Sequence, residues 1–246
     1  NIKSLFSASI PLESICTPRV GLGTTNNAIF VRSWQEIAWP NVCIGAVDRV
    51  EAKNSRKKWF PYNKGGSFRR WYGNNEYVID WNNDGENVKK YIEFKNPNVA
   101  RGESHYFKEG VTWGLITSSA FSCRYMERGF IFDVGGSSGF PPKDKIEFSL
   151  AFFFFNLAQL IIKCLNPTVN TQVGDLQRLP VLSIEGDVSD NINKITRILI
   201  EFYKKDWDST ECSWNFQAPL IVDIRMDGLL SSSYASLFDI KANDFK

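Results

Sequence analysis

The feature that most limits how this chain can fold is the apolar segment of residues 143–165. Pro141-Pro142 precedes it and Asn166-Pro167 follows it, and the residue before a proline is disfavoured in a helix. The most hydrophobic part, residues 148–162, is shorter than the roughly 20 residues that cross a bilayer, and Lys163 follows it. The segment therefore predicts one long helix buried in the core of a protein domain, with no membrane association.

Short strands and one further helix account for most of the remaining chain. Patterns of apolar residues predict strands near residues 28–31, 42–47, 77–81, 111–121, 129–134 and 179–184, and a helix near 86–93. In residues 189–203, apolar side chains recur at steps of three and four, which indicates an amphipathic helix. The expected fold class is α+β, with a mixed or antiparallel sheet around a central buried helix. We expect this domain in residues 1–186 and a helical C-terminal extension in residues 187–246.

Composition excludes several kinds of enzyme. With 246 residues and 43% hydrophobic residues the chain is long enough for a sizeable core, but it has a single histidine, His105. Zinc sites that need two histidines are therefore impossible within it. The five cysteines are scattered, without any Cys-x-x-Cys pair, which favours a reducing cytoplasm. The chain also starts without Met, which suggests a piece of a longer protein.

The most informative segment for function is residues 53–72, which is basic and aromatic, although the net charge of the chain is only +2. Its cations are Lys53, Arg56, Lys57, Lys58, Lys64, Arg69 and Arg70, with no acid between Glu51 and Glu76, and its aromatics are Trp59, Phe60, Tyr62, Phe68, Trp71 and Tyr72. Cations bind phosphates, and aromatic rings stack on bases or wedge between them. The segment predicts a nucleic-acid surface, unless the aromatics belong to the core and the cations form its solvated flank.

Six strings along the chain, in order, resemble one known family. They are Gly23-Thr-Thr-Asn-Asn-Ala-Ile-Phe-Val-Arg-Ser-Trp-Gln-Glu36, Lys58-Trp-Phe-Pro-Tyr-Asn-Lys-Gly-Gly-Ser-Phe-Arg-Arg-Trp-Tyr-Gly73, Tyr106-Phe-Lys-Glu-Gly-Val-Thr-Trp113, Gly129-Phe-Ile-Phe-Asp-Val134, Leu165-Asn-Pro-Thr-Val-Asn-Thr-Gln-Val-Gly-Asp175 and Asp206-Trp-Asp-Ser209. The chain resembles the C-terminal target recognition region of the PglX-type adenine-specific DNA methyltransferases of BREX phage-defence systems, which are related to type IIG restriction-modification enzymes.

This resemblance implies a bacterial, cytoplasmic domain that chooses the DNA site for an N6-adenine methyltransferase. The upstream domain of the same polypeptide would bind S-adenosylmethionine and do the chemistry, so no cofactor is expected in this chain. The residues agree with methyl transfer by another domain. Asn96-Pro97 and Asn166-Pro167 lack the second proline and the aromatic residue with which such enzymes hold a flipped adenine. The expected partners are double-stranded DNA, the upstream domain and other phage-defence proteins.

Three sets of residues are the predicted DNA contacts. The first comes from the basic segment and the residues directly after it, the second from a loop between two predicted strands, and the third from the turn after the long helix. They are Lys57, Lys58, Lys64, Arg69, Arg70, Tyr72, Asn74 and Asn75; Ser118, Ser119, Arg124 and Tyr125; and Asn170, Thr171 and Gln172.

Three other functions remain open from the sequence. A metal-dependent nuclease would use Asp80 or Asp84 with Glu93 and Lys95. A carbohydrate-binding module would stack sugars on surface aromatics. A protein-interaction domain would use the helical tail.

Overall fold

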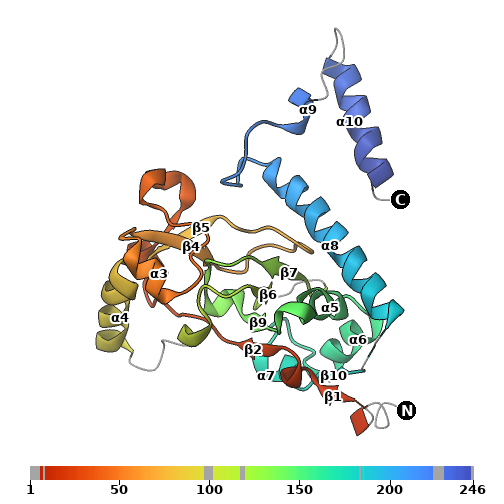
Figure 1. The fold of residues 1–246 in the computed structure, drawn as a ribbon, viewed down its shortest axis with the longest axis horizontal. Coiled ribbons are helices and arrows are strands. Elements are labelled where there is room, and N and C mark those ends of the chain that lie inside the picture. The colour runs from red at the N-terminus through yellow and green to blue at the C-terminus, as the bar shows by residue number, and fades with distance from the viewer. Residues whose placement is uncertain are drawn as a thin grey trace.

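The computed structural model describes residues 6–7, 9–96, 102–116, 120–182, 184, 186–223 and 230–244. Strands and helices alternate along the chain before helices take over at its C-terminal end (Figure 1). The strands are β1 (Ile10–Pro11), β2 (Thr17–Arg19), β3 (Val31–Ser33), β4 (Trp59–Asn63), β5 (Tyr77–Asp80), β6 (Gly110–Trp113), β7 (Cys123–Met126), β8 (Ile131–Phe132), β9 (Ser138–Phe140) and β10 (Pro180–Val181). The α-helices are α2 (Asn27–Phe30), α3 (Arg49–Asn54), α4 (Asn82–Lys95), α5 (Ile146–Phe152), α6 (Asn156–Leu165), α7 (Val173–Gln177), α8 (Asp187–Asp208), α9 (Leu220–Asp223) and α10 (Leu230–Asp244).

The described strands form three small sheets. One four-stranded sheet has the order β2-β9-β6-β7 and is antiparallel throughout. The other has the order β3-β5-β4-β8, in which β4 and β8 run parallel and the other pairs are antiparallel. The two-residue strands β1 and β10 form the third. The predicted class, α+β with mixed and antiparallel strands, is confirmed, although the strands divide among three sheets.

The predicted long helix of residues 143–165 is wrong as a single helix, because it is divided into α5 and α6, which meet at a bend of 75°. Four consecutive phenylalanines, Phe152 to Phe155, lie at the break. In one continuous helix their rings would point about 100° apart around the axis. The break instead lets Phe153 pack against Trp113 and Phe121, at centroid distances of 5.9 and 5.2 Å. The expectation of a buried central helix holds for α5, in which every side chain except Glu147 is buried.

No single helix in the described ranges is long and apolar enough to span a membrane; α5 and α6 reach that length and composition only when taken together as a bent pair.

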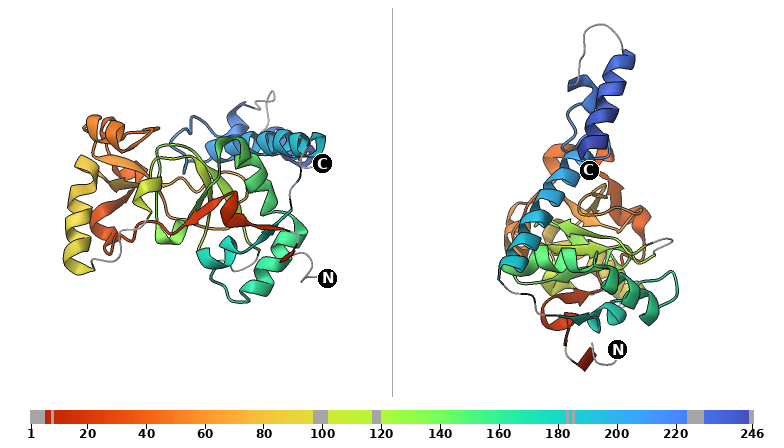
Figure 2. Two further views of the ribbon diagram at one scale, coloured as in Figure 1. Left: turned by 60° about the horizontal axis from the view of Figure 1, so that its bottom comes forward. Right: turned by 90° about the vertical axis from the view of Figure 1, so that its right-hand side faces the viewer.

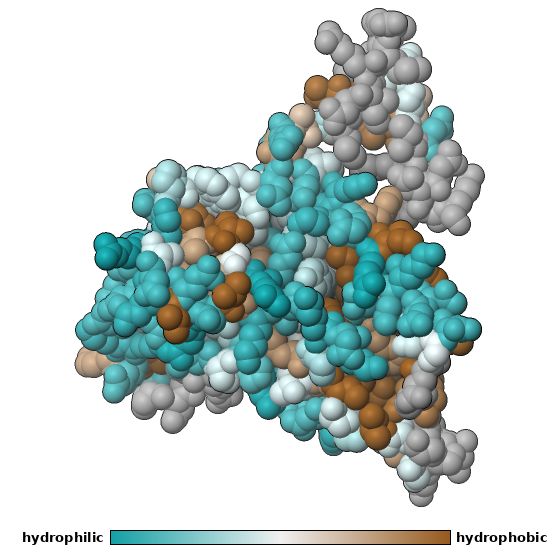
Figure 3. All heavy atoms as spheres, in the orientation of Figure 1, coloured by the Kyte–Doolittle hydropathy of each residue, from teal (hydrophilic) through white to brown (hydrophobic). Residues whose placement is uncertain are grey.

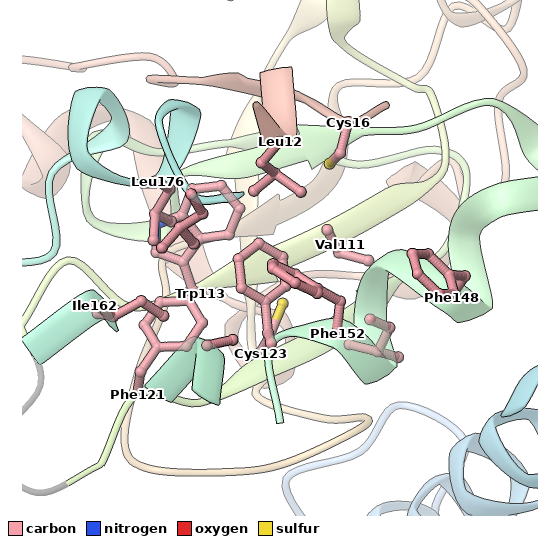
Figure 4. Packing of buried hydrophobic residues seen from close by; sticks show 14 of the residues in the cluster. Leu12, Cys16, Val111, Trp113, Phe121, Cys123, Phe148, Phe152, Ile162 and Leu176 are labelled. Carbon is pink, nitrogen blue, oxygen red and sulfur yellow. The ribbon is translucent and has the colours of Figure 1, made fainter. Parts of the chain in front are cut away.

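Two large hydrophobic clusters hold the described parts of the molecule together, and Val42, Trp59 and Val78 form a third, small one. The larger lies between the antiparallel sheet and the helices α5 to α8, with Trp113 and Leu176 fully buried (Figure 4). The second large cluster packs the mixed sheet against α4, through Val88 and Ile92. Helix α8 belongs to the larger cluster because Ile200 is buried there, and α8 packs on α5. Helices α9 and α10 stand away from both sheets (Figures 1 and 2).

Two predicted strands are replaced by other structure. Residues 28–30 lie in the short helix α2, because the Asn26 side chain accepts a hydrogen bond from the Ile29 amide and so caps a helical turn. Residues 42–47 form no regular strand: Val42 makes one isolated bridge to Trp59, and Gly45 then turns the chain with a φ of 77°. The amphipathic helix predicted over residues 189–203 is confirmed as α8 and extends further at both ends.

Candidate nucleic-acid interface

The predicted basic segment, residues 53–72, contains the end of α3, the whole of β4 and most of the long connection after it. We call residues 64–76, which join β4 to β5, the basic loop. Trp59 and Phe60, at the start of β4, are buried in the core, with exposed fractions of 8% and 0%. The aromatics of the strand are therefore core residues, and the DNA-binding interpretation of the segment now depends on the basic loop.

The first turn of the basic loop is fixed by the carbonyl group of Gly65. That carbonyl accepts hydrogen bonds from Asn74 Nδ2 at 3.0 Å and from Arg124 Nη2 at 2.8 Å. Asn74 Nδ2 also donates to the Ser67 carbonyl, at 2.8 Å. Gly65 has a φ of 84°, and a Cβ atom there would lie 2.3 Å from the Gly135 oxygen. Only glycine allows this close approach of two backbones.

Arg69 ties the loop to helix α8. Its Nη2 atom lies 2.7 Å from Asp206 Oδ2, and its guanidinium carbon lies 4.9 Å from the centroid of the Trp207 ring. Its Nε atom also donates to the carbonyl of Tyr72 at 2.9 Å. Arg69 was predicted as a DNA contact, but in this structure its Nε and Nη2 atoms donate to other residues of the protein. We therefore interpret it as an anchor of the loop.

Trp71 and Tyr72 fix the far side of the loop. Trp71 forms a backbone bridge to Arg124 in β7, and its ring packs on Phe154 at a centroid distance of 4.3 Å. The hydroxyl of Tyr72 donates to Glu127 at 3.0 Å and accepts from Lys204 Nζ at 2.9 Å. Burial, and then the nearby Glu127 carboxylate, raise the pKa of Tyr72 well above its ordinary value. Tyr72 is 1% exposed, so its ring lies beyond the reach of a duplex at the surface.

Between these anchors the tip of the loop faces outward. Residues 66–68 are exposed, and Phe68 has an exposed fraction of 52%. The guanidinium carbon of Arg70 lies 5.6 Å from the ring centroids of Phe68 and Phe154. Among the residues that the structure describes, no carboxylate pairs with Arg70. The tip therefore presents an exposed aromatic ring and a cation that is available to bind an anion. Phe68 is missing from the predicted contacts because composition alone does not separate it from the core aromatics.

The other lysines of the first set do not lie together. Lys57 and Lys58 precede β4, whereas Lys64 follows it, about 17 Å away along a five-residue strand. Lys57 Nζ donates to the Pro40 carbonyl, and Lys58 Nζ lies 3.5 Å from Asp80. Lys64 is the first residue of the basic loop, and its Nζ atom lies 3.9 Å from Asp133.

The remaining predicted contacts divide between surface and interior. Asn74, Asn75, Arg124 and Thr171 are at most 9% exposed, so they do not reach a duplex in this conformation. Ser118 and Ser119 lie outside the described residues. Tyr125 is half-buried, and its hydroxyl donates to Glu109 at 3.2 Å, whereas Asn170 and Gln172 are exposed.

The third set is connected to the basic loop through residues 114–116. Ile116 forms an antiparallel bridge with Asn170, and the Thr171 amide donates to the Leu115 carbonyl at 2.7 Å. A Cβ atom on Gly114 would lie 3.6 Å from the Gly66 oxygen. The basic loop and the turn of residues 166–172 therefore lie on either side of residues 114–116, which directly follow β6. Beside the turn lies a cavity of about 350 Å³, with Phe121 and Lys163 in its lining.

The two aspartates considered for a nuclease are engaged in ion pairs. Asp84 accepts hydrogen bonds from Arg49 Nε and Lys89 Nζ, both at 2.9 Å, and Asp80 pairs with Lys58. Burial tends to raise the pKa of Asp84, but the hydrogen bonds from the two cations outweigh it and hold that pKa below its ordinary value. Within the described ranges, no group of three His, Cys, Asp or Glu side chains is placed to hold a metal ion.

The chain is homologous to a segment of adenine-specific methyltransferases. It is 36% identical over 227 residues to the adenine-specific methyltransferase PglX of Lacticaseibacillus casei (strain Zhang), an alignment that covers 90% of this chain. It is 35% identical over 242 residues to the adenine-specific methyltransferase BrxX of Escherichia coli O9:H4 (strain HS), which covers 95% of this chain. The aligned region spans 18% of the length of each relative. No family model matches the chain.

Proposed function

We propose that this chain is a target recognition domain, which reads a sequence in double-stranded DNA for an N6-adenine methyltransferase of a BREX phage-defence system. It would occupy the C-terminal part of that protein, while an upstream domain binds S-adenosylmethionine and transfers the methyl group. The observation that carries the proposal is the tip of the basic loop, where Phe68 is exposed on a firmly anchored turn beside Arg70, a cation that pairs with no carboxylate of the described ranges. Homology to adenine-specific methyltransferases supports it.

The anchors give the loop a physical role in recognition. A loop that is already ordered loses little conformational entropy when it binds, so more of its contact energy appears as affinity. Arg70 would contact phosphate or a guanine edge, and Phe68 would stack against a base step. Asn170 and Gln172, exposed on the neighbouring turn, have amides suited to adenine.

Replacing Arg70 with Gln tests the DNA contact, because the change removes the cation without disturbing a hydrogen bond that holds the loop. We expect weaker binding to a fluorescent mixed-sequence duplex, and a fall of about one in the slope of log K against log salt. Lys95→Gln is the matched control, since Lys95 lies 5.0 Å from the ring of an exposed Phe94, on α4. Equal effects of the two substitutions would contradict the assignment of the tip.

Specificity requires the intact methyltransferase. We expect the methylated motif of a bacterial host to change when residues 12–185 are exchanged for those of a relative. A motif that survives the exchange would exclude the recognition role. Incubation of the chain with plasmid and magnesium separates the proposal from the nuclease alternative, because a recognition domain leaves the plasmid intact.

A protein-interaction role remains the second candidate, because large apolar side chains are exposed on several helices. Leu157 and Leu160 of α6 and Ile195 and Ile198 of α8 are between 47% and 59% exposed. Figure 3 shows hydrophobic side chains gathered on the right of the molecule, where Figure 1 places α6 and α8. Such a surface suits another domain or protein. Loss of copurification with the rest of the methyltransferase after Leu160→Ser, with DNA binding unchanged by Arg70→Gln, would favour this candidate.

A further inference from the structure

Arg124 lies in β7, beneath the basic loop, and its side chain is completely buried. Its Nη2 atom donates a hydrogen bond to the Gly65 carbonyl at 2.8 Å. Its other two nitrogen atoms, Nε and Nη1, are buried and have no hydrogen-bond partner among the described residues. Burial lowers the pKa of the guanidinium to about 10, so it remains cationic at neutral pH. The interior of the protein therefore holds a positive charge behind the loop.

That charge differs from its neighbours in how it is balanced. Lys64 has Asp133 nearby, and Arg69 has Asp206. Arg124 has no carboxylate within ion-pairing distance in the described part of the chain, and the Arg69 charge lowers its pKa further. The loop and the strand beneath it are thus locally positive even though the whole chain is nearly neutral.

An isolated buried cation lowers the stability of a folded protein. Its loss of hydration exceeds what one hydrogen bond to a carbonyl returns, and apolar replacements of buried charges are often neutral or stabilising. Folding stability therefore does not explain why an arginine stands at this position. Its location directly behind the Gly65 carbonyl, whose geometry sets the first turn of the loop, connects it to the binding surface instead.

We propose that Arg124 is a positioning residue for DNA binding, which fixes the Gly65 carbonyl and supplies a buried charge that a phosphate at the loop balances. This inference rests on the proposed function. Because the charge is buried, it is poorly screened by salt and acts through a medium of low dielectric constant. DNA would in this way receive a contribution from a residue that it never touches.

Three substitutions separate the charge from the hydrogen bond. Arg124→Met removes both, Arg124→Gln keeps a neutral amide donor, and Arg124→Lys keeps the charge. We expect affinity for a mixed-sequence duplex at about 50 mM salt to fall on the order of tenfold in the Met and Gln variants, and to stay within about threefold of wild type in the Lys variant. We also expect the melting temperature of Arg124→Met to equal or exceed that of the unchanged chain. Lys90→Gln removes an exposed cation from α4 and is the charge control.

A purely structural arginine would give the opposite pattern. The Met variant would then lose thermal stability, and the Gln and Lys variants would lose affinity to the same extent. Either result overturns the inference, as does failure of all three variants to fold. If the unchanged chain itself binds no DNA, alone or within the intact methyltransferase, the proposed function fails. If it binds and the Gln variant binds equally well, only the role of Arg124 is refuted.

Discussion

Removing helix α8 tests whether the described fold is complete without its C-terminal region. A chain that ends at Gly186 lacks Ile200 and Trp207, which are 8% and 5% exposed in the larger hydrophobic cluster. It also lacks Asp206, the ion-pair partner of Arg69. We expect this shortened chain to lose its cooperative folded state. The boundary between residues 186 and 187, predicted from sequence, would then mark a change of secondary structure within one folding unit.

The magnitude follows from the buried apolar surface. Full burial of a large aliphatic or aromatic side chain contributes about 1.5–3 kcal/mol, so Ile200 and Trp207 together contribute about 3–6 kcal/mol. The apolar side chains of α5 that α8 covers become exposed as well, which adds a comparable amount. A loss of about 6–12 kcal/mol approaches the total stability of a typical domain, about 5–15 kcal/mol.

Thermal unfolding followed by near-ultraviolet circular dichroism measures the effect. A chain that ends at Pro219 is the control, because it keeps α8 and removes only α9 and α10. In α10 the side chains of Tyr234 and Phe238 are 59% and 77% exposed, so their removal costs little. A chain of residues 1–186 that unfolds cooperatively at the temperature of the control would refute the reasoning.

Three smaller changes test individual features. Gly65→Ala places a Cβ against the Gly135 oxygen at a positive φ, so urea denaturation should show a loss of about 1–3 kcal/mol, whereas Gly174→Ala, with open space around it, should show little. Burial raises the pKa of Cys16 to about 12, so mass spectrometry after alkylation at pH 8 should find exposed Cys164 modified and Cys16 unmodified unless urea is present. The lowered pKa of Asp84 stabilises the fold above the ordinary carboxyl range, and this contribution disappears as pH falls through the folded pKa. Asp84→Asn should therefore lower stability at neutral pH and have little effect in strong acid, as urea midpoints at the two pH values would show.

Much of the fold could be predicted, because periodic patterns report burial directly. The three- and four-residue steps of residues 189–203 identified α8, and the expected class and buried helix were confirmed. The break between α5 and α6 could not be predicted, since it depends on rings from distant segments, Trp113 and Phe121, which receive Phe153.

The candidate site was only partly predictable for the same reason. The sequence located the basic segment. Its composition does not show which aromatic residues are buried in the core and which one, Phe68, is exposed. Arg124 was expected in a loop because the strand before it was expected to continue to residue 121. That strand ends at Trp113, and Arg124 lies inside the next strand, opposite Thr112. A buried arginine without a carboxylate nearby in the described ranges runs against the usual statistics of burial, so no pattern predicts it.

The division of the basic loop into anchors and tip has a consequence for how such a domain diversifies. Asn74 bonds to Gly65 and Ser67 within the loop, Trp71 and Arg69 attach the loop to Phe154 and to α8, and residues 66–68 face outward. Substitutions at Ser67 and Phe68 leave those attachments intact, whereas a Cβ atom at Gly66 would lie 2.8 Å from Asn74 Nδ2. New side chains could therefore be tried there one at a time, each on the same frame, without the compensating changes that a new core residue would demand.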